Sequence, residues 1–318
     1  MLKKKMKKVV AKKGAYKFNR DGVTNSLLQK WLSCRVAARH SLDGIRHDLY
    51  KPKTQLGSFF HALLEKWYTL KQEGAKCFDR QVFDAFAASE RDKIIESGGD
   101  LQKFEALLAS AYGLFMEYVP FHKKSDAKKD WGGLEEVFDV KWNGYRLRGR
   151  IDGWYKDITG KLCLFETKTK SRISEDTIKT SLLFDSQNLF YITAMEVITG
   201  ERINEVCYNV VRSPSLRQKQ TETQEDYYVR IREDIAKRPE HYFKRFPVQY
   251  TQRQKKVYQQ DLMLKLHEFD EWCAGNRPTY RSECSCSRGW ECTYLNLCAT
   301  GCMESYNMNG ILFGELQD

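Results

Sequence analysis

Apolar and polar residues alternate along three neighbouring segments of the chain, at about 134–142, 145–156 and 161–168. Alternation with a period of two, together with aromatic and β-branched residues, predicts β-strands. The residues DITG at 157–160 form a turn signal between the second and third segments. A helix at about 182–199 and a further strand at 205–212 follow. The pattern predicts an α/β core made of a three-stranded meander, a helix and a returning strand.

Helical periodicity dominates the segments on both sides of this core. Apolar residues recur at helical spacing in 55–120 and predict an α-helical insertion, which a polar linker at 123–130 joins to the first strand. After the core, 225–275 is helical apart from a break at 239–247. We therefore expect five parts: a basic flexible arm at 1–20, an N-terminal helical region with Cys34 and His61 at 21–130, the α/β core at 131–213, a mobile loop at 214–226, and a C-terminal helical and cysteine-rich region at 227–318.

Composition and charge limit the classes of protein to which this chain can belong. The 318 residues are 42% hydrophobic and 13% aromatic, enough for a large core, and no apolar run approaches a membrane span. The formal net charge is +11, but residues 1–20 hold eight lysines and Arg20 without an acidic residue, so the remainder is close to neutral. The lysine arm can bind nucleic-acid phosphates or serve as a solubilising tail, and the sequence leaves both open. Because the N-terminal stretch lacks the apolar run of a signal peptide, we expect a cytoplasmic protein of a bacterium or phage-infected cell.

Asp152, Glu166 and Lys168 are the most informative polar residues of the predicted strands. If a three-residue loop at 158–160 joins the two strands, Asp152 lies opposite Glu166, and Lys168 shares the face of Glu166. Two carboxylates side by side among apolar residues repel each other unless a cation lies between them. Mg²⁺ or Mn²⁺ suits such a site, and the lysine can orient an attacking water or offset charge on a phosphate. A surface hairpin with a chance ion pair is the alternative.

Four short motifs follow one another along the chain around these carboxylates. They are GSFFH at 57–61, GRID at 149–152, ETK at 166–168 and QNLFY at 187–191. In this order they resemble the RecB-like branch of the PD-(D/E)XK nucleases, which includes the nuclease domains of RecB and AddB, CRISPR-associated adaptation nucleases and many phage exonucleases. The resemblance implies a restriction-endonuclease-like core, with a mixed central sheet flanked by helices. To that core this chain adds the α-helical insertion and a C-terminal cysteine-rich segment.

The resemblance also implies the ligands of a divalent metal ion. Asp152, Glu166 and Lys168 would be catalytic, and the ion would be held by His61, Asp152, Glu166 and the backbone carbonyl of Thr167. A histidine binds metals through a neutral imidazole nitrogen. Taken by itself, His61 lies in an apolar helical pattern, where a histidine is more often a satisfied core or surface group.

Gln187 and Tyr191 are four residues apart and so share one face of the helix predicted there. The resemblance implies that this pair lies beside the active site, supports Lys168 and contacts DNA. The alternative is that Tyr191 packs as ordinary core with the apolar residues around it.

The function implied is that of a metal-dependent DNA nuclease, in which Lys168 positions water for in-line attack on a phosphodiester. An exonuclease acting on duplex ends or single strands is favoured over an endonuclease. The setting would be phage or bacterial DNA replication, recombination or repair, with a helicase, recombination or replication protein as partner. Two alternatives remain: a catalytically silent DNA-binding or scaffold subunit, and a nuclease active only within a larger recombination or CRISPR-adaptation complex.

Ten cysteines in a cytoplasmic protein are not expected to form disulfides. Four of them lie in apolar or helical settings that predict small buried hydrophobic groups: Cys77, Cys163, Cys207 and Cys273. Five others crowd into 284–302, and this density is typical of thiolate metal ligands.

Iron–sulfur members of the nuclease family bind a [4Fe–4S] cluster with one cysteine before the nuclease core and three after it. By resemblance the ligands would be Cys34, Cys286, Cys292 and Cys298, with Cys284 and Cys302 as substitutes. The spacing departs from the family, because Cys286 stands six residues before Cys292 where the family usually has three. A Zn²⁺ ion held by C-terminal thiolates is the alternative. Such a cluster would join distant segments and act structurally.

Overall fold

The structure, a computed structural model, describes residues 16–47, 52–75, 78–96, 100–287, 292–308, 312, 313 and 316. At its centre is a five-stranded sheet with the order β2-β3-β4-β5-β6. β4 and β5 run parallel, and the other neighbouring strands are antiparallel, so the sheet is mixed as expected. Its strands are β2 (Asp130–Trp142), β3 (Tyr145–Lys156), β4 (Leu162–Lys170), β5 (Glu205–Arg212) and β6 (Phe243–Gln249).

The β3–β4 hairpin has the register that the turn signal predicts. Gly153 pairs with Phe165, and the backbone N–H of Asp157 donates to the carbonyl of Lys161 at 3.0 Å. The Asp157 carboxylate also accepts from backbone N–H groups inside the loop. Gly160 has a φ of 78°, a conformation that favours glycine. The loop therefore determines which faces of the two strands meet, and the predicted register is confirmed.

The helices predicted on both sides of the break at 239–247 are confirmed, but the sequence pattern does not predict the fifth strand, β6, which lies there. It pairs with β5 alone and forms an edge of the sheet. An edge tolerates Pro247, which has no N–H for a strand partner. Phe246 and Val248 are buried, but the charged Arg245 and the proline obscure the alternation in the sequence. The sheet consequently extends beyond the range 131–213 expected for the core.

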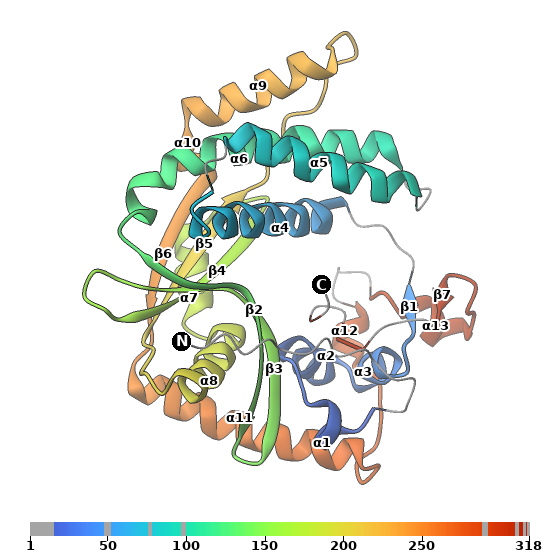
Figure 1. Cartoon of the computed structure of the whole chain (residues 1–318). Helices are drawn as coiled ribbons and strands as arrows, with labels where there is room; N and C mark the ends of the chain where they lie inside the picture. Colours follow the sequence, from blue (N-terminus) through green and yellow to red (C-terminus); the bar gives the residue numbers. More distant parts are fainter. Residues whose placement is uncertain are drawn as a thin grey trace.

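Four helices form a cap over one face of the sheet (Figure 1). Their shared apolar cluster includes Phe60, Phe115 and Ile231, all fully buried. The cap consists of α4 (Pro52–Gln72), α5 (Asp79–Glu96), α6 (Leu101–Asp126) and α9 (Gln224–Lys237). The predicted helical insertion is confirmed, but α6 continues into the range expected to be a linker. Tyr118 and His122, one turn apart, are buried and keep the end of that helix packed.

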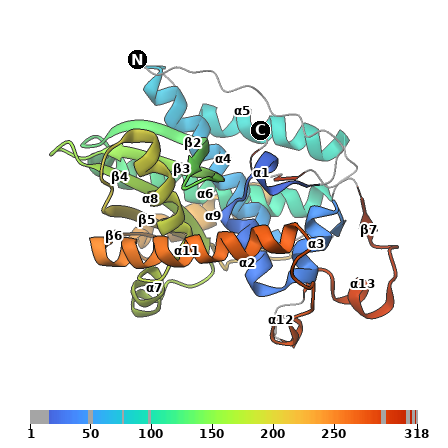
Figure 2. The same cartoon turned by 90° about the horizontal axis from the view of Figure 1, so that it is seen from below.

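The opposite face of the sheet is covered by α8 (Ser186–Thr199) and α11 (Gln252–Cys273), and Figure 2 shows α11 running alongside α8. Helix α8 starts later than predicted because Asp185 caps it, accepting from the backbone N–H of Asn188 at 2.9 Å. Two short helices complete the core, α7 (Glu175–Leu182) and α10 (Pro239–Tyr242). None of the helices in the described residues is both long and apolar enough to cross a membrane.

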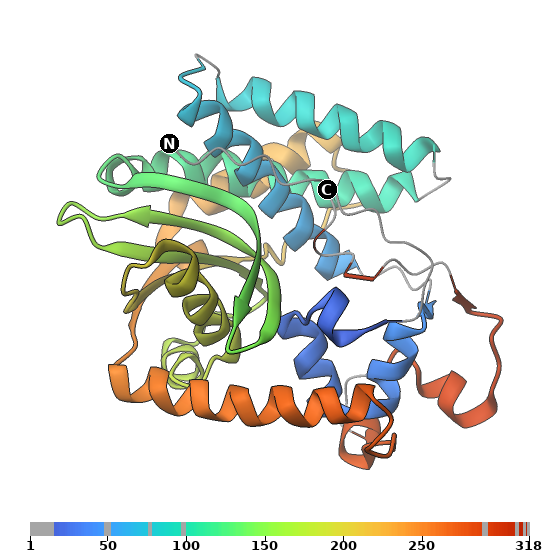
Figure 3. The same ribbon diagram turned by 60° about the horizontal axis from the view of Figure 1, so that its bottom comes forward.

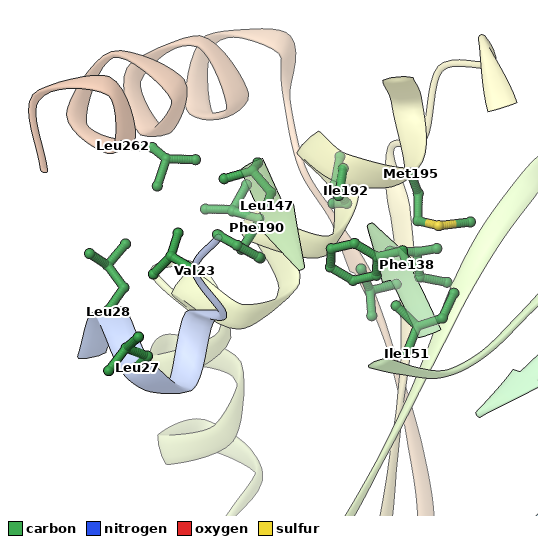
Figure 4. Close-up of a cluster of buried hydrophobic side chains, with 14 of the residues drawn as sticks. Val23, Leu27, Leu28, Phe138, Leu147, Ile151, Phe190, Ile192, Met195 and Leu262 are labelled. Atoms are coloured by element: carbon green, nitrogen blue, oxygen red, sulfur yellow. The ribbon is translucent and has the colours of Figure 1, made fainter. Parts of the chain in front are cut away.

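The folded chain begins before residue 21. Phe18 of α1 (Phe18–Asp21) is buried, and Val23 pairs with Leu147 beside β3. Val23 and two leucines of α2 (Asn25–Ser33) belong to the same apolar cluster as Phe190 of α8 (Figure 4). The start of α2 is thereby fixed next to the hairpin. The flexible arm predicted at 1–20 overlaps this folded part, and its residues 1–15 lie outside the described residues.

Beside α3 (Arg35–Leu42), the segment that follows this helix meets the C-terminal segment, drawn in blue and red at the right of Figure 3. The short strand β1 (Arg46–His47) pairs with β7 (Tyr306–Asn307). Two short helices, α12 (Glu283–Ser287) and α13 (Leu295–Thr300), carry the C-terminal cysteines toward this junction. In the segment predicted to be a mobile loop, residues 224–226 already belong to α9, whose cap is Thr223. The mobility of that loop stays a prediction.

His122 makes the stability of the cap depend on pH. It is 6% exposed and packs against Tyr118, with 4.5 Å between the ring centroids. Burial, helped by the charge of Arg245, lowers its pKa from 6.5 to about 3. Below pH 6.5 His122 therefore takes up a proton in the unfolded chain but stays neutral in the folded protein until the pH approaches 3. The stability from this site is fully present above pH 6.5 and is lost as the pH falls toward 3.

We expect the free energy of unfolding to decrease below pH 6.5, with His122 contributing up to about 1.4 kcal/mol per pH unit. His122→Phe keeps the aromatic packing and should flatten this slope, which urea unfolding at several pH values between 6.5 and 4.5 would measure. The control is His267→Gln at an exposed position, which should leave the slope as it is. Equal slopes for the wild type and His122→Phe would contradict the prediction.

Candidate metal centre and active site

Helix α4 brings His61 to the sheet. Phe60 and Leu63 on the same helix are fully buried in the cap, so the neighbouring face, which carries His61, points toward the hairpin. The GRID motif lies opposite, on β3. A Cβ at Gly149 of that motif would come within 2.4 Å of the Phe138 ring and 3.2 Å of Tyr191. Only glycine permits this close packing of α8 against the sheet.

His61, Glu135 and Asp152 form a group whose ligand atoms all lie within 4.8 Å of one another, and it is the one such group of three or more in the described residues. Nδ1 of His61 is 3.5 Å from Oδ2 of Asp152 and 3.7 Å from Oε1 of Glu135. Burial opposes a charge on the imidazole, but the two carboxylates outweigh it and raise the pKa of His61 to about 10. The pocket therefore strongly favours a positive charge at this point, as a cation site requires.

Glu135 is the residue of this group that the sequence motifs do not identify. It has a φ of 45°, in the left-handed region that residues other than glycine rarely occupy. Arg150 of the GRID motif holds its other carboxylate oxygen, at 3.2 Å from Nε. Strained backbone in a site is often associated with function. The one trace in the sequence is an acidic pair, Glu135 and Glu136, within a predicted strand.

Glu166 is 2% exposed, and its two carboxylate oxygens differ. Oε1 accepts from Nζ of Lys168 and from Nε2 of Gln187 at 2.9 Å. Oε2 is buried without a hydrogen-bond partner among the described residues. Burial and the charge of Asp152 raise the pKa of Glu166 to about 7. A buried carboxylate with one unpaired oxygen, beside a second carboxylate, fits a divalent cation, which would supply the missing partner.

Asp152 is fixed by the neighbouring strand. Its Oδ2 accepts from the backbone N–H of Thr167 at 2.6 Å. Burial would raise the pKa of Asp152, but His61 and Lys168 outweigh it and lower that pKa. The carboxylate is thus charged and oriented. The charge of Asp152 acts on Glu166, but Glu166 lies outside the group of His61, Glu135 and Asp152. The roles of Glu166 and of the Thr167 carbonyl as ligands stay predictions.

The predicted pair on α8 reaches the lysine. Oε1 of Gln187 accepts from Nζ of Lys168 at 3.2 Å, and Nε2 of Gln187 donates to the hydroxyl of Tyr191 at 3.0 Å. Burial and the charge of Glu166 raise the pKa of Tyr191, so the hydroxyl stays neutral. Gln187 thereby orients both Lys168 and Glu166. DNA contact by this pair stays a prediction.

These groups line a cavity of about 450 Å³ between the cap, the sheet and the start of α2. His61 enters it from α4, Arg150 and Asp152 from β3, and the ETK motif from β4. Several neutral polar side chains complete the wall: Thr24, Asn25, Ser26, Ser58, Thr169 and Gln187. A cavity with one group of carboxylates, one lysine and hydroxyl-rich walls can hold a metal ion and a phosphate together.

The cysteines predicted as cluster ligands lie near the junction of β1 and β7. Cys34 is buried between α2 and α3, in an apolar cluster that also contacts Cys292 and Cys298. Burial raises the pKa of the Cys298 thiol, and so do the nearby thiols of Cys292, Cys34 and Cys286. The hydroxyl of Ser285 donates to the carbonyl of Ser33 at 2.7 Å, next to Cys34.

The other cysteines lie elsewhere. Cys163 and Cys207 are buried in the sheet as expected, and Cys273 is partly buried. Cys284 is exposed and Cys302 is half-buried; both stay substitutes by prediction. Cys77 lies outside the described residues.

Comparison with known proteins identifies the family of this chain. The family model of the PD-(D/E)XK nuclease superfamily matches residues 23–299. Among solved structures, a crystal structure of a proposed exonuclease from Eubacterium rectale is similar, with a TM-score of 0.51 and 13% identity over 86% of this chain and 90% of that one. No curated protein matches the chain. The protein belongs to the PD-(D/E)XK nuclease superfamily; its place in the RecB-like branch stays a prediction.

Proposed function

We propose that this nuclease is a metal-dependent deoxyribonuclease and that it degrades DNA from ends or as single strands. The observation that carries the proposal is the group of His61, Glu135 and Asp152, together with a buried Glu166 oxygen that has no hydrogen-bond partner among the described residues and belongs to a residue lining the same cavity. Carboxylate oxygens with one imidazole suit Mn²⁺ or Mg²⁺. A silent scaffold would not need to keep these costly buried charges.

The residues of the site divide the work of phosphodiester hydrolysis. Asp152 and Glu166, with His61, Glu135 and the Thr167 carbonyl, would hold the ion, which when bound polarises the phosphate and makes water more acidic. Lys168 lies against Glu166 and Gln187, so its ammonium is oriented before DNA arrives. Burial disfavours the charged amine, but Glu166 and Asp152 outweigh it and raise the pKa of Lys168. The lysine therefore remains charged, and can orient water and offset charge on the phosphate.

We favour an exonuclease over an endonuclease because of the order of the motifs and because the chain is similar in fold to a proposed exonuclease. Its setting would be bacterial or phage DNA replication, recombination or repair in the cytoplasm, with a helicase, recombination or replication protein as partner. A nuclease that works only in a recombination or CRISPR-adaptation complex would have the same site.

We also propose that Cys34, Cys286, Cys292 and Cys298 hold a [4Fe–4S] cluster. The donor types fit, because thiolates are the ligands that such clusters use, and Cys34, Cys292 and Cys298 lie in one apolar cluster. The cluster would cross-link the segment around Cys34 to the C-terminal run and hold α2 in place. Zn²⁺ bound by thiolates is the alternative.

The decisive experiment incubates the purified protein with end-labelled single-stranded and duplex DNA and with closed circular DNA, each with Mg²⁺, Mn²⁺ or a chelator. We expect metal-dependent release of label from linear DNA while the closed circle stays intact. Cleavage of the circle would indicate an endonuclease. Absence of cleavage with either metal would contradict the proposal and favour the silent subunit.

A further inference from the structure

We infer that a buried chain of polar side chains between the sheet and helix α6 of the cap positions the metal-binding residues. It runs from Asp126 through Arg245 and Asn209 to Thr167. The inference rests on the proposed function, since it concerns the same metal ion. Asp126, Arg245 and Asn209 would be positioning residues, which act through Thr167 and through helix α4.

The chain is continuous in hydrogen bonds. Nδ2 of Asn209 on β5 donates to the Thr167 hydroxyl on β4 at 3.1 Å. Nε of Arg245 on β6 donates to Oδ1 of Asn209 at 3.2 Å. The same guanidinium donates to both carboxylate oxygens of Asp126, at 2.5 and 3.2 Å, at the end of α6. Tyr118 accepts from it at 2.8 Å. Three elements, β5, β6 and α6, are thereby linked to β4, the strand that carries the ETK motif.

Burial makes this chain rigid. Asn209 is 0% exposed and Thr167 is 2% exposed, and the side chains of Arg245 and Asp126 are only 12% and 11% exposed. A buried amide or charge is costly unless its hydrogen bonds are satisfied. Asn209 is flanked along the strand by the buried Tyr208 and Val210, so it is the polar residue of this stretch whose burial carries such a cost. Its amide is satisfied only while Thr167 and Arg245 keep their places, so each member fixes the next.

The other end of the chain reaches the helix that carries His61. The hydroxyl of Tyr68 on α4 donates to Oδ2 of Asp126 at 2.6 Å. Tyr68 lies two turns beyond His61 on the same helix. Asp126 therefore fixes α4 on one side and, through Arg245 and Asn209, β4 on the other. The backbone N–H of Thr167 orients the carboxylate of Asp152. The distance between this carboxylate and the imidazole of His61 therefore depends on the positions of both α4 and β4.

The test is Mn²⁺ affinity, measured by calorimetric titration of the full-length protein without DNA. Asn209→Leu keeps the shape of the side chain but removes both hydrogen bonds. We expect its dissociation constant for Mn²⁺ to rise about 10- to 100-fold, the range for loss of a residue that orients a metal ligand. Cleavage at saturating Mn²⁺ should stay within about threefold of the wild type, so the loss is in metal affinity rather than in kcat.

The control is Tyr118→Phe, which removes a hydrogen bond from the same guanidinium but leaves the chain to Thr167 intact. It should lower the melting temperature without changing Mn²⁺ affinity. If Asn209→Leu lowers the melting temperature but binds Mn²⁺ as the wild type does, the residue is merely structural and the inference is wrong. If the wild type itself binds no Mn²⁺, the proposed function fails instead.

A second variant keeps the inference testable if the first does not fold. If circular dichroism shows that Asn209→Leu is unfolded, Mn²⁺ affinity is measured for Arg245→Lys instead. Lysine keeps the charge opposite Asp126 but lacks the planar fork that also reaches Asn209. Weaker Mn²⁺ binding by Arg245→Lys supports the inference, and unchanged binding overturns it.

Discussion

Glu166→Gln is expected to slow DNA cleavage by about 10³-fold or more, the equivalent of several kcal/mol of transition-state stabilisation. Glutamine has the shape of glutamate but no charge, and the neighbouring carboxylate of Asp152 would lose its partner in holding a divalent ion. The unpaired Oε2 of Glu166 is the atom most in need of that ion. Single-turnover cleavage of end-labelled DNA at saturating Mg²⁺ or Mn²⁺ measures the effect.

Two neighbouring glutamates supply a graded comparison. Glu135 belongs to the group with His61 and Asp152, so Glu135→Gln should reduce cleavage at limiting metal by about 10- to 100-fold. Glu136 is exposed and instead accepts from the indole of Trp154 at 2.7 Å. Glu136→Gln should cleave within about twofold of the wild type. If Glu166→Gln cleaves at the wild-type rate, the assignment of this centre as the active site is wrong.

The hairpin was predictable because its register depends on local signals. The turn sequence at 157–160 closes a loop of set length, and the alternation of side chains then determines which residues face each other. The relative placement of Asp152 and Glu166 therefore depends on the hairpin alone and on no contact with a segment distant in the sequence. Gln187 and Tyr191 were predictable because helical spacing places them on one face. The contact of Gln187 with Lys168, however, was implied by the family motif and not by spacing.

Glu135 could not be predicted in the same way. Its carboxylate joins the site because the backbone takes a positive φ there, and that conformation has no signature in a non-glycine residue. Asn209 and Arg245 lie on strands whose pairing is not local, and β6 itself was missed. When the role of a polar residue depends on tertiary contacts, the sequence shows only its residue type. Because that type is also common on protein surfaces, the role cannot be predicted from it.

The cysteines illustrate the opposite case. The spacing between Cys286 and Cys292 departs from the family, yet the thiols of both influence the pKa of Cys298 together with Cys34. The three-dimensional placement depends on β1, β7 and the contact of Ser285 with Ser33. Linear spacing alone therefore does not decide whether these thiols bind one metal group, and the ligand set stays a proposal.

Cys34→Ser is expected to remove the bound iron and lower the melting temperature by roughly 10 °C, which corresponds to a few kcal/mol in a chain of this size. Cys34 lies directly between α2 and α3, so loss of the proposed thiolate ligand would free the end of α2, the helix whose start lines the cavity. DNA binding should weaken with stability. Iron and acid-labile sulfide content, visible absorption and thermal unfolding of anaerobically purified protein measure these effects.

The matched control is Cys273→Ser, a partly buried cysteine at the end of α11 outside the proposed ligand set, which should keep the full iron content. Cys284→Ser and Cys302→Ser test the substitutes: iron loss in either would move the fourth ligand to that position. A colourless protein that contains zinc but no iron would contradict the cluster and establish the Zn²⁺ alternative. If Cys34→Ser then retains its zinc, the metal is held by the C-terminal thiolates alone, and the cross-link to α2 does not exist.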